Sequence, residues 1–446
     1  MAKFRVYALG PGGVQRTFIY DNMVSTFVDE ATGKSIVPIK ARGDFPVVLT
    51  TSKNTPNGKK SPRILKISLG LSCNYECDYC SQRFVPRAAE TNPRNVEDFM
   101  EGLDSWVKEP PERIELWGGE PLVYIKTLRP LAEALRAKYP HTDFGIITNG
   151  SLLTKEINEW LDRLGFTVGL SHDGPGQHVR GPDPLEDPKK REAILDLWNR
   201  LGPKQRMSFN SILNKDNTSR AAIQDFFVKL TGDPKVPIGE GVLLDTYDAG
   251  ALQVAPDMGE LVEYRQRAFA EVRKGLASNF NLVREKIQRF INGLITQEPA
   301  TAIGMKCGMD NPSVVAVDLK GNVLTCQNTS VEGVAPNGES HKIGHVSDMA
   351  GVKLTTSTHW SHRESCPNCP MLHLCRGSCM FLEGPLFHAS CNNSFSDSVV
   401  YFAAAVEFLT GCIPVRIEGP NHPSRHSIWE KPAVPPKQKV IPIKAV

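Results

Sequence analysis

The stretch that decides the fold runs from Arg63 to Cys80 and reads RILKISLGLSCNYECDYC. Its first seven residues are mostly apolar and β-prone, and the strand that they predict leads into Cys73, Cys77 and Cys80 with the spacing CxxxCxxC. Three thiolates on one short loop can hold three irons of a cubane cluster and leave the fourth iron open to another ligand. A zinc site with a distant fourth ligand is the alternative, but this spacing is unusual for zinc.

Strand-like runs and helical segments alternate on the C-terminal side of residue 62. The runs are RILKISL (63–69), RIELWGG (113–119), DFGIITN (143–149), FTVGLSHD (166–173), RMSFNSIL (206–213) and VPIGEGVLLD (236–245). Segments with helical periodicity separate them, at about 92–107, 127–139, 154–165, 189–201 and 219–230. This alternation predicts parallel βαβ units, and therefore an α/β fold that closes as a partial (β/α)6 barrel.

Polar motifs follow the first four predicted strands. The cysteine loop follows the first strand, GGEP (118–121) the second, ITNG (147–150) closes the third, and SHDG (171–174) closes the fourth. In a parallel α/β barrel the carboxyl ends of the strands meet on one face, which carries the active site. We therefore expect these four motifs to lie together.

These motifs resemble those of the radical S-adenosylmethionine (SAM) superfamily, including the aromatic Tyr79 just before the last cysteine of the loop. The resemblance implies that the open iron binds the methionine part of SAM and that the GGEP segment supports its amino group. Tyr79 would lie near the adenine, with simple packing as the alternative. Ser171 and Asp173 would contact the ribose, with a turn cap as the alternative. The cofactor-binding residues predicted in this way are Tyr79, Gly118, Gly119, Glu120, Pro121, Asn149, Ser171, Asp173 and Asn210. Asn149 and Asn210 are weaker candidates for the ribose or methionine side, and Glu240 is a guess.

A second group of cysteines lies in the C-terminal third of the chain. The segment CPNCPMLHLCRGSC (366–379) has the spacing CxxCx5CxxxC, and Gly321 precedes Cys326 by five residues. Together with the cysteines on either side, this resembles the seven-cysteine SPASM domain, which carries two auxiliary 4Fe-4S clusters. A zinc ribbon is the alternative for the CxxC and CxxxC pairs. The predicted ligands are Cys307, Cys326 and Cys379 for the first auxiliary cluster, and Cys366, Cys369, Cys375 and Cys391 for the second.

The first auxiliary cluster is one ligand short in this prediction. The related anaerobic sulfatase-maturating enzymes carry a further cysteine shortly after the first one, where this chain reads GMDNPS (308–313). This departure weakens an assignment as a sulfatase maturase. Asp310 and Cys412 are conceivable fourth ligands, although a buried free thiol is the better interpretation of Cys412. With the SAM-binding cluster, the resemblance implies three 4Fe-4S clusters in all.

Composition limits the partners that the protein can have. The chain of 446 residues has a formal net charge of +3, which gives no strong attraction to nucleic acid or to an anionic membrane. The most apolar stretch, VVYFAAAVEFLTGCI (399–413), is interrupted by Glu407 and is too short to span a bilayer. The N-terminus lacks the features of a signal peptide, so we expect a cytoplasmic protein whose eleven cysteines serve metal or redox chemistry.

The predicted organisation has five parts. They are a β-rich segment (1–62), the radical SAM partial barrel (63–255), a helical bridge (256–300), the SPASM auxiliary-cluster domain (301–412) and a Pro- and Lys-rich tail (413–446). The first part is too short and too poor in helix for the leader-peptide recognition domain of many peptide maturases.

The resemblance implies reductive cleavage of SAM and hydrogen abstraction from a side chain of a peptide or protein substrate. A flavodoxin- or ferredoxin-type electron donor would supply the electron. Oxidation of a cysteine or serine in a protein, as in sulfatase maturation, is one alternative. A non-enzymatic metal-binding interaction module is the other, and the intact cysteine loop argues against it.

Overall fold

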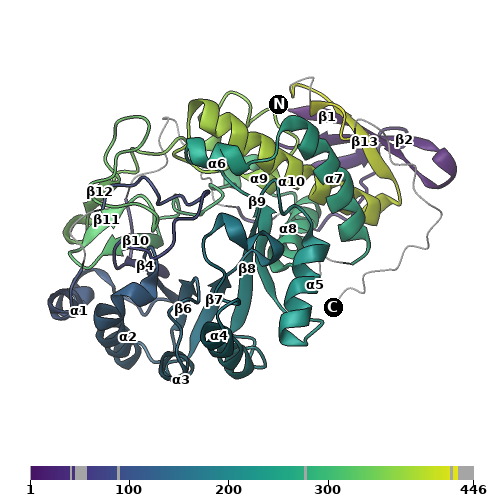
Figure 1. Ribbon diagram of the computed structural model, residues 1–446. Coiled ribbons are helices and arrows are strands. Elements are labelled where there is room, and N and C mark those ends of the chain that lie inside the picture. The colour runs from purple at the N-terminus through teal and green to yellow at the C-terminus, as the bar shows by residue number, and fades with distance from the viewer. Residues whose placement is uncertain are drawn as a thin grey trace.

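The computed structural model describes residues 2–40, 43–45, 58–87, 91–275, 279–421 and 425–429. Its centre is a nine-stranded sheet with the order β12-β11-β10-β4-β5-β6-β7-β8-β9 (Figure 1). The six predicted strands lie in sequence order within it and are all parallel: β4 (Ile64–Ser68), β5 (Arg113–Trp117), β6 (Asp143–Thr148), β7 (Phe166–Ser171), β8 (Met207–Leu213) and β9 (Ile238–Leu243). The predicted α/β fold with a partial barrel is confirmed.

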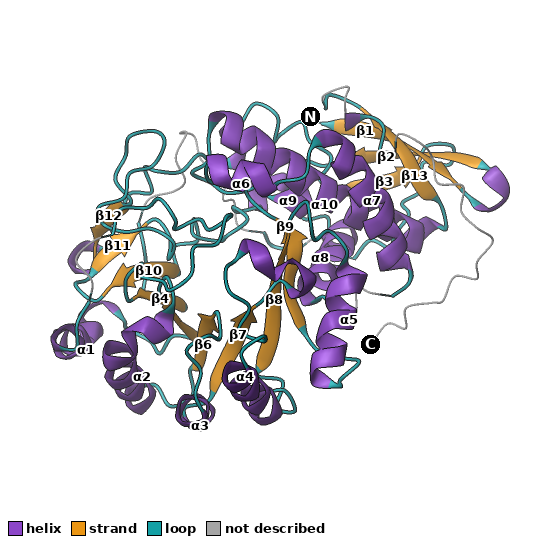
Figure 2. Cartoon of the chain, in the orientation of Figure 1, coloured by secondary structure: helices purple, strands orange, loops and turns teal. Residues whose placement is uncertain are grey.

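Five helices connect these strands, at the places where helical periodicity predicts them. They are α1 (Arg94–Trp106), α2 (Ile125–Lys138), α3 (Lys155–Arg163), α4 (Pro188–Leu201) and α5 (Arg220–Thr231). Thr154 and Ser219 cap α3 and α5 by accepting hydrogen bonds from backbone N–H groups in the first turn. Figure 2 shows α1 to α4 on the outer side of the sheet, so the loops at the carboxyl ends of the strands remain free to build a site.

The cysteine-rich region adds three strands to the same sheet, which the sequence did not predict. β10 (Val314–Asp318) runs parallel to β4, and the antiparallel strands β11 (Asn322–Leu324) and β12 (Lys342–His345) follow it. The pairing of Val314 with Ile64 and of Asp318 with Ser68 fixes the register. The segment after Cys307 is therefore continuous with the barrel at the edge beside the cysteine loop.

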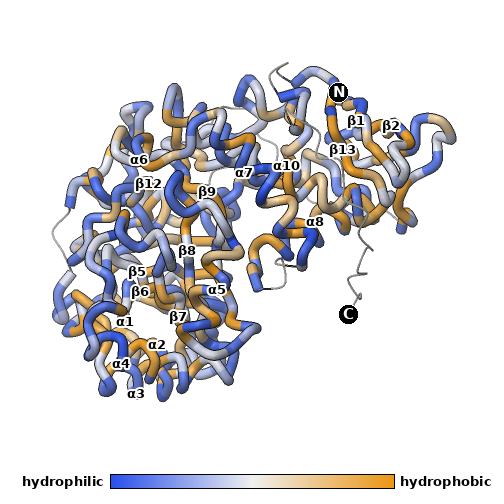
Figure 3. The backbone as a smooth tube through the Cα atoms, turned by 45° about the vertical axis from the view of Figure 1, so that its right-hand side comes forward, coloured by the Kyte–Doolittle hydropathy of each residue, from blue (hydrophilic) through white to orange (hydrophobic). Residues whose placement is uncertain are grey.

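A second sheet joins the two ends of the chain. Its order is β13-β1-β2-β3, all antiparallel, formed by β1 (Lys3–Leu9), β2 (Gln15–Asp21), β3 (Thr26–Asp29) and β13 (Ile413–Glu418). Figure 3 shows hydrophobic stretches along β1 and β13. The sequence analysis assigns residues 413–418 to the Pro- and Lys-rich tail, but in the structure they form a regular strand. Residues 430–446 of the predicted tail and residues 46–57 of the predicted β-rich segment lie outside the described part of the chain.

Further helices follow β9. They are α6 (Ala249–Val254), α7 (Met258–Arg273), α8 (Asn281–Thr296), α9 (Leu372–Cys375) and the long α10 (Gly384–Thr410). The longest of them, α10, packs against α7, α8 and β13. Tyr20 of β2 contacts the rings of Phe290 on α8 and Phe402 on α10, with ring centroids 5.9 and 5.8 Å away. Short 3-10 helices complete the fold: η1 (Pro11–Gly13), η2 (Pro121–Tyr124), η3 (Gly174–Val179), η5 (Ala300–Ala302), η6 (Val346–Asp348) and η7 (Trp360–His362). No helix in the described ranges combines the length and apolar character that a membrane span requires.

Candidate functional site

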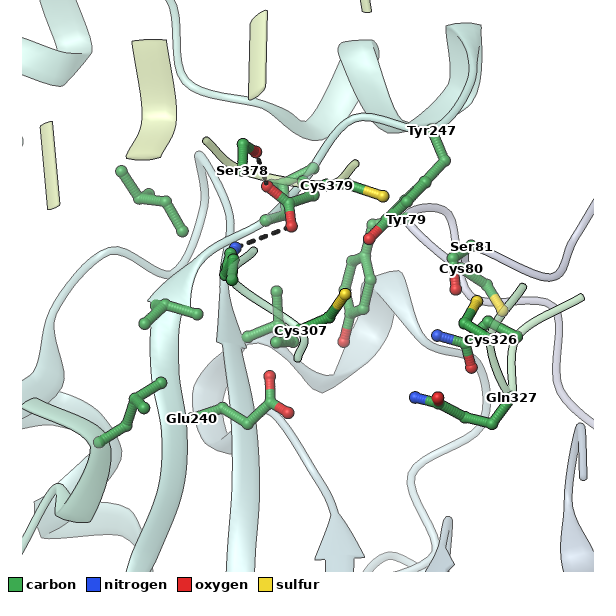
Figure 4. A pocket seen from close by; sticks show the side chains of 18 of the residues that line it. Tyr79, Cys80, Ser81, Glu240, Tyr247, Cys307, Cys326, Gln327, Ser378 and Cys379 are labelled. Atoms are coloured by element: carbon green, nitrogen blue, oxygen red, sulfur yellow. Dashed lines mark hydrogen bonds and ion pairs between the residues drawn. The ribbon is translucent and has the colours of Figure 1, made fainter. Parts of the chain in front are cut away.

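One large cavity, of about 540 Å³, opens at the carboxyl ends of the barrel strands. Cysteines from four separate segments line it: Cys77 and Cys80 from the loop after β4, Cys307, Cys326 and Cys379. Figure 4 shows the side chains of four of these cysteines in a single view, together with Tyr79 and Glu240. The fold therefore brings thiols separated by about 300 residues in the sequence to the wall of one space.

The loop after β4 holds its thiols with backbone donors. The N–H of Tyr75 donates to Sγ of Cys73 over 3.4 Å, and the N–H of Gln82 donates to Sγ of Cys80 over the same distance. Burial raises the pKa of Cys77 to about 12. A buried thiol with this pKa is a poor nucleophile, yet a bound metal deprotonates such a group outright. The donor set and its backbone hydrogen bonds fit thiolates that ligate a cluster.

Gly118 and Gly119 line the cavity beside this loop. The N–H of Gly119 donates to the carbonyl oxygen of Gly70 over 3.0 Å. A Cβ at Gly119 would lie 2.5 Å from the carbonyl oxygens of both Leu71 and Ser72. Only glycine permits this close approach, which fixes the start of the cysteine loop against the end of β5.

Glu120 follows these glycines and lies behind the cavity wall. Its side chain does not line the cavity; it is buried and accepts three hydrogen bonds. The donors are the N–H of Leu122 (3.0 Å), the N–H of Asn149 (2.7 Å) and the hydroxyl of Thr148 (2.8 Å). Burial raises the pKa of Glu120, while the backbone donors of Asn149 and Leu122 act against that rise. The carboxylate of Glu120 thus links the end of β5 to the end of β6 through hydrogen bonds. It also caps η2, whose first residue is Pro121.

Tyr79 lies on the cavity wall and is held by two charged groups. Its hydroxyl donates to Oδ2 of Asp173 over 2.5 Å and accepts from Nη1 of Arg180 over 2.8 Å. The other carboxylate oxygen of Asp173 accepts from the N–H of Ile212 over 2.9 Å. Asp173 is therefore fully engaged within the protein and absent from the cavity wall, whereas Tyr79 and Arg180 line it.

The other predicted SAM contacts also lie behind the wall. Asn149 donates to Oδ1 of Asn74 over 2.9 Å and so links the end of β6 to the cysteine loop. Asn210 lies across the barrel interior, where a Cβ at Gly239 would come within 2.1 Å of its Oδ1. Ser171 ends β7 and does not line the cavity. The structure thus brings Tyr79, Gly118 and Gly119 to the cavity, and it places Glu120, Pro121, Asn149, Ser171, Asp173 and Asn210 in the layer that supports it.

The other four predicted ligands of the auxiliary clusters line a second, small cavity: Cys366, Cys369, Cys375 and Cys391. Nη2 of Arg425 lies 3.3 Å from Sγ of Cys391, so a guanidinium cation lies beside the four cysteines. Burial raises the pKa of Cys369 to about 12. The division of the seven cysteines between the two cavities is the one that the SPASM resemblance implies, three and four.

Neither candidate for the missing ligand of the first auxiliary cluster reaches the large cavity. Oδ2 of Asp310 accepts from the N–H of Met305 over 2.9 Å, and the residue is buried. Cys412 is buried beside the small sheet, where a Cβ at Gly10 would lie 3.2 Å from its Sγ. The cavity is therefore lined by the thiols of Cys307, Cys326 and Cys379, whereas Asp310 and Cys412 do not line it.

Several cavity residues had little or no signal in the sequence. Asp245 forms an ion pair with Nζ of Lys306 over 2.9 Å and accepts from the hydroxyl of Ser378 over 3.1 Å (Figure 4). Glu240 projects into the cavity from a bulge in β9 with φ of 59°, a left-handed conformation unusual for glutamate. Only the IGEG context, with a glycine on each side, hinted at Glu240.

The described residues contain no group of three or more His, Cys, Asp and Glu side chains arranged around a single metal ion. A cubane cluster has a different requirement, because its thiolates surround a larger body instead of converging on one atom. Thiols spread over the wall of one cavity and around another fit that requirement.

The fold and the thiol-lined cavity define a partial-barrel α/β protein with its site at the carboxyl ends of the strands. The family model of the Radical SAM superfamily matches residues 67–220, which contain the cysteine loop and the strands β5 to β8. Residues 67–220 thus form a radical SAM domain.

Two curated proteins and one solved structure show the extent of the similarity. The serine-type anaerobic sulfatase-maturating enzyme of Bacteroides thetaiotaomicron is 22% identical over 363 residues, 70% of this chain and 80% of that protein. The radical SAM cyclopropyl synthase TigE of Paramaledivibacter caminithermalis is 26% identical over 174 residues, 34% of this chain and 36% of that protein. The structure of anSMEcpe with bound AdoMet and the Cp18Cys peptide shares the fold, with a TM-score of 0.55 and 16% identity over 78% of this chain and 98% of that one.

Proposed function

We propose that this radical SAM enzyme abstracts hydrogen from a side chain of a peptide or protein, with peptide maturation as its role. The observation that carries the proposal is the single cavity, which exposes thiols of the barrel loop and thiols of the C-terminal region to the same space. Bound SAM and a reduced cluster would supply the radical chemistry that hydrogen abstraction from an unactivated carbon requires. A cavity of about 540 Å³ leaves room for a substrate side chain beside the cofactor.

The residues of the chain bind and orient the reactants. The SAM-binding cluster would be ligated by Cys73, Cys77 and Cys80. Beside it, the absence of side chains at Gly118 and Gly119 would leave space for SAM. The hydrogen-bonded group of Tyr79, Asp173 and Arg180 would form a rigid wall of the SAM pocket, because each hydroxyl and carboxylate oxygen in it already has a partner. Rigid walls that exclude water protect a radical from side reactions and fix its distance from the target carbon.

The two groups of C-terminal cysteines support a SPASM-type domain with two auxiliary clusters, and so three 4Fe-4S clusters in all. The four thiols of the small cavity would enclose one cluster completely, and Cys307, Cys326 and Cys379 would leave one iron of the other open to the large cavity. A flavodoxin- or ferredoxin-type protein in the cytoplasm is the proposed electron donor. We also propose that the chain is divided into the five parts predicted from the sequence.

The similarity to the sulfatase-maturating enzyme over 363 residues supports a second candidate, oxidation of a cysteine or serine in a protein. Both functions use the same radical and the same cavity. They differ in the product, which is a carbonyl at a single residue in the second function and a new bond or an altered centre in the first.

The test begins with the metal content of the anaerobically reconstituted enzyme. We expect about twelve irons per chain, and about eight irons with no SAM cleavage when Cys73, Cys77 and Cys80 are all replaced by Ala. Cys412→Ala is the matched control and retains the full iron content, because Cys412 is remote from both cavities. An iron content near four would remove the SPASM assignment.

The substrate is tested with peptides encoded beside the gene, deuterated at the candidate positions. Transfer of deuterium into 5′-deoxyadenosine supports the proposal, and mass analysis of the peptide separates the two candidate products. If deuterium is transferred from a small metabolite and from no peptide, the peptide function is wrong.

A further inference from the structure

Three cationic side chains line one part of the large cavity, and we refer to them as the basic wall. Lys286 and Arg289 project from α8, and Arg376 follows α9. Arg376 adopts a left-handed conformation with φ of 57°, which is uncommon for arginine and sets the direction in which its side chain leaves the chain. Neither α8 nor the left-handed turn belongs to the SAM-binding barrel.

No acidic side chain in the described part of the chain forms an ion pair with the basic wall. Within the described ranges, the side chains of Lys286, Arg289 and Arg376 form no ion pair and no hydrogen bond. Nε of Arg376 is buried and has no hydrogen-bond acceptor. Lys286 lies over the ring of Tyr401, with Nζ 5.5 Å from the ring centroid.

Other cations on the same cavity are neutralised. Lys306 is paired with Asp245, and Arg180 is paired with Asp173 and Tyr79. Glu285 also lines the cavity and lies four residues before Arg289 on α8, yet no ion pair joins them. Lys286 and Arg376 are partly buried, whereas Arg289 is exposed. A partly buried cation without an anionic partner is costly, and a ligand anion beside it removes that cost.

The nearby cysteine group accounts for only part of these charges, although Lys286 lies close enough to act on the thiol of Cys375. The small cavity of four cysteines already has its own cation, Arg425, which points at Sγ of Cys391 and hydrogen-bonds Oδ1 of Asn392 over 3.0 Å. The residues of the basic wall border the large cavity and are absent from the small one. Their charges face the space that a substrate enters.

We propose that the basic wall binds a carboxylate of the peptide substrate through Lys286, Arg289 and Arg376. The inference rests on the proposed peptide-modifying function and specifies an acidic side chain or the C-terminal carboxylate as the anchor. Because α8 and the cysteine loop border the same cavity, an anchored carboxylate would hold the peptide in the space that Glu240 and Tyr79 also line. Glu240 would repel a second carboxylate from the radical centre and so help to fix the direction of the peptide.

The experiment measures binding to the reconstituted holoenzyme with SAM, under anaerobic conditions, by fluorescence anisotropy. The probes are three fluorescein-labelled octapeptides of Gly and Ala. The first contains two glutamates and an amidated C-terminus, the second two glutamines and an amidated C-terminus, and the third two glutamines and a free C-terminal carboxylate. The first and third probes distinguish the two sources of the carboxylate.

We expect one of the carboxylate peptides to bind at least about tenfold more tightly than the neutral peptide, as charge-assisted hydrogen bonds imply. The double variant Lys286→Gln, Arg376→Gln should lose this preference while it keeps its iron content and its SAM cleavage without substrate. Arg284→Gln is the matched control, because Arg284 is an exposed cation of the same helix that does not line the cavity.

Three outcomes overturn the inference. They are equal or undetectable binding of all three peptides, a preference that survives in the double variant, and a double variant that loses iron together with the preference. The last result would assign the cations to an auxiliary cluster. Failure of the proposed function is recognised separately, because it shows as absence of deuterium transfer from every peptide and leaves the binding comparison intact.

Discussion

A buried charged network ties the last barrel strand to the C-terminal helix α10, and its removal gives the sharpest test of how the two parts depend on each other. Asp397 of α10 accepts from Nη2 of Arg220 over 2.9 Å and from the N–H of Leu243 over 3.0 Å. The hydroxyl of Tyr264 on α7 also donates to it. Arg220 in turn donates to the carbonyl oxygen of Gly241 in β9 over 2.8 Å.

The substitution Asp397→Asn removes the negative charge and keeps the shape. The side chains of Arg220 and Asp397 are only 1% and 4% exposed, so the guanidinium would remain buried without its counter-charge. Breaking one side of a buried pair costs about 3–5 kcal/mol. This loss is a large part of the roughly 5–15 kcal/mol by which native proteins are stable.

The assay is urea unfolding of the variant and wild-type proteins under identical anaerobic conditions, followed by circular dichroism. Asp104→Asn serves as the control, because Asp104 is 75% exposed in its pair with Lys138 and should cost less than about 1 kcal/mol. The double variant Arg220→Met, Asp397→Asn should be more stable than Asp397→Asn alone, since no unpaired charge remains. A loss below about 1 kcal/mol for Asp397→Asn, or a double variant that is no more stable, would refute the reasoning.

Three further predictions concern single residues. Glu120→Gln should lower the free energy of unfolding by about 1–3 kcal/mol and weaken SAM binding, because an amide cannot accept all three hydrogen bonds. Unchanged urea unfolding and an unchanged SAM titration would contradict this prediction. Glu240→Gly should change the free energy of unfolding by less than about 1 kcal/mol, since glycine relieves the left-handed strain. The same substitution should reduce the amount of modified product formed per 5′-deoxyadenosine. An unchanged ratio would show that the side chain does not orient substrate. Burial lowers the pKa of His341 from 6.5 to about 4, so stability should fall as the pH drops below 6.5, by on the order of 2 kcal/mol at pH 5. His341→Phe should flatten that pH dependence in urea titrations at pH 5 and 7, and parallel curves for both proteins would exclude His341 as its source.

Local sequence patterns were sufficient for the barrel and for the position of its site. Each predicted strand from RILKISL to VPIGEGVLLD is a strand in the structure, because apolar β-prone runs between amphipathic helices have few other ways to bury their side chains. The cysteine loop and the GG pair meet at one cavity because the carboxyl ends of parallel strands share one face.

Side-chain direction within that site was beyond the reach of sequence. Glu120 stands beside two glycines that face the cavity, yet its carboxylate turns inward to the donors at Leu122, Thr148 and Asn149. Those donors belong partly to the next strand, so their positions depend on the pairing of β5 with β6. A motif gives the residue type at a position, whereas the neighbouring strand decides which way the side chain points.

Long-range contacts settled the rest. The sequence by itself determined the cysteine spacings and the alternation of strands and helices, because both depend on neighbours a few residues apart. Only the tertiary structure placed β10 beside β4, paired β13 with β1 and gathered Lys286, Arg289 and Arg376 on one wall. These contacts join segments that are tens to hundreds of residues apart, and no local preference encodes which edge strand or which helix face will be free to meet them.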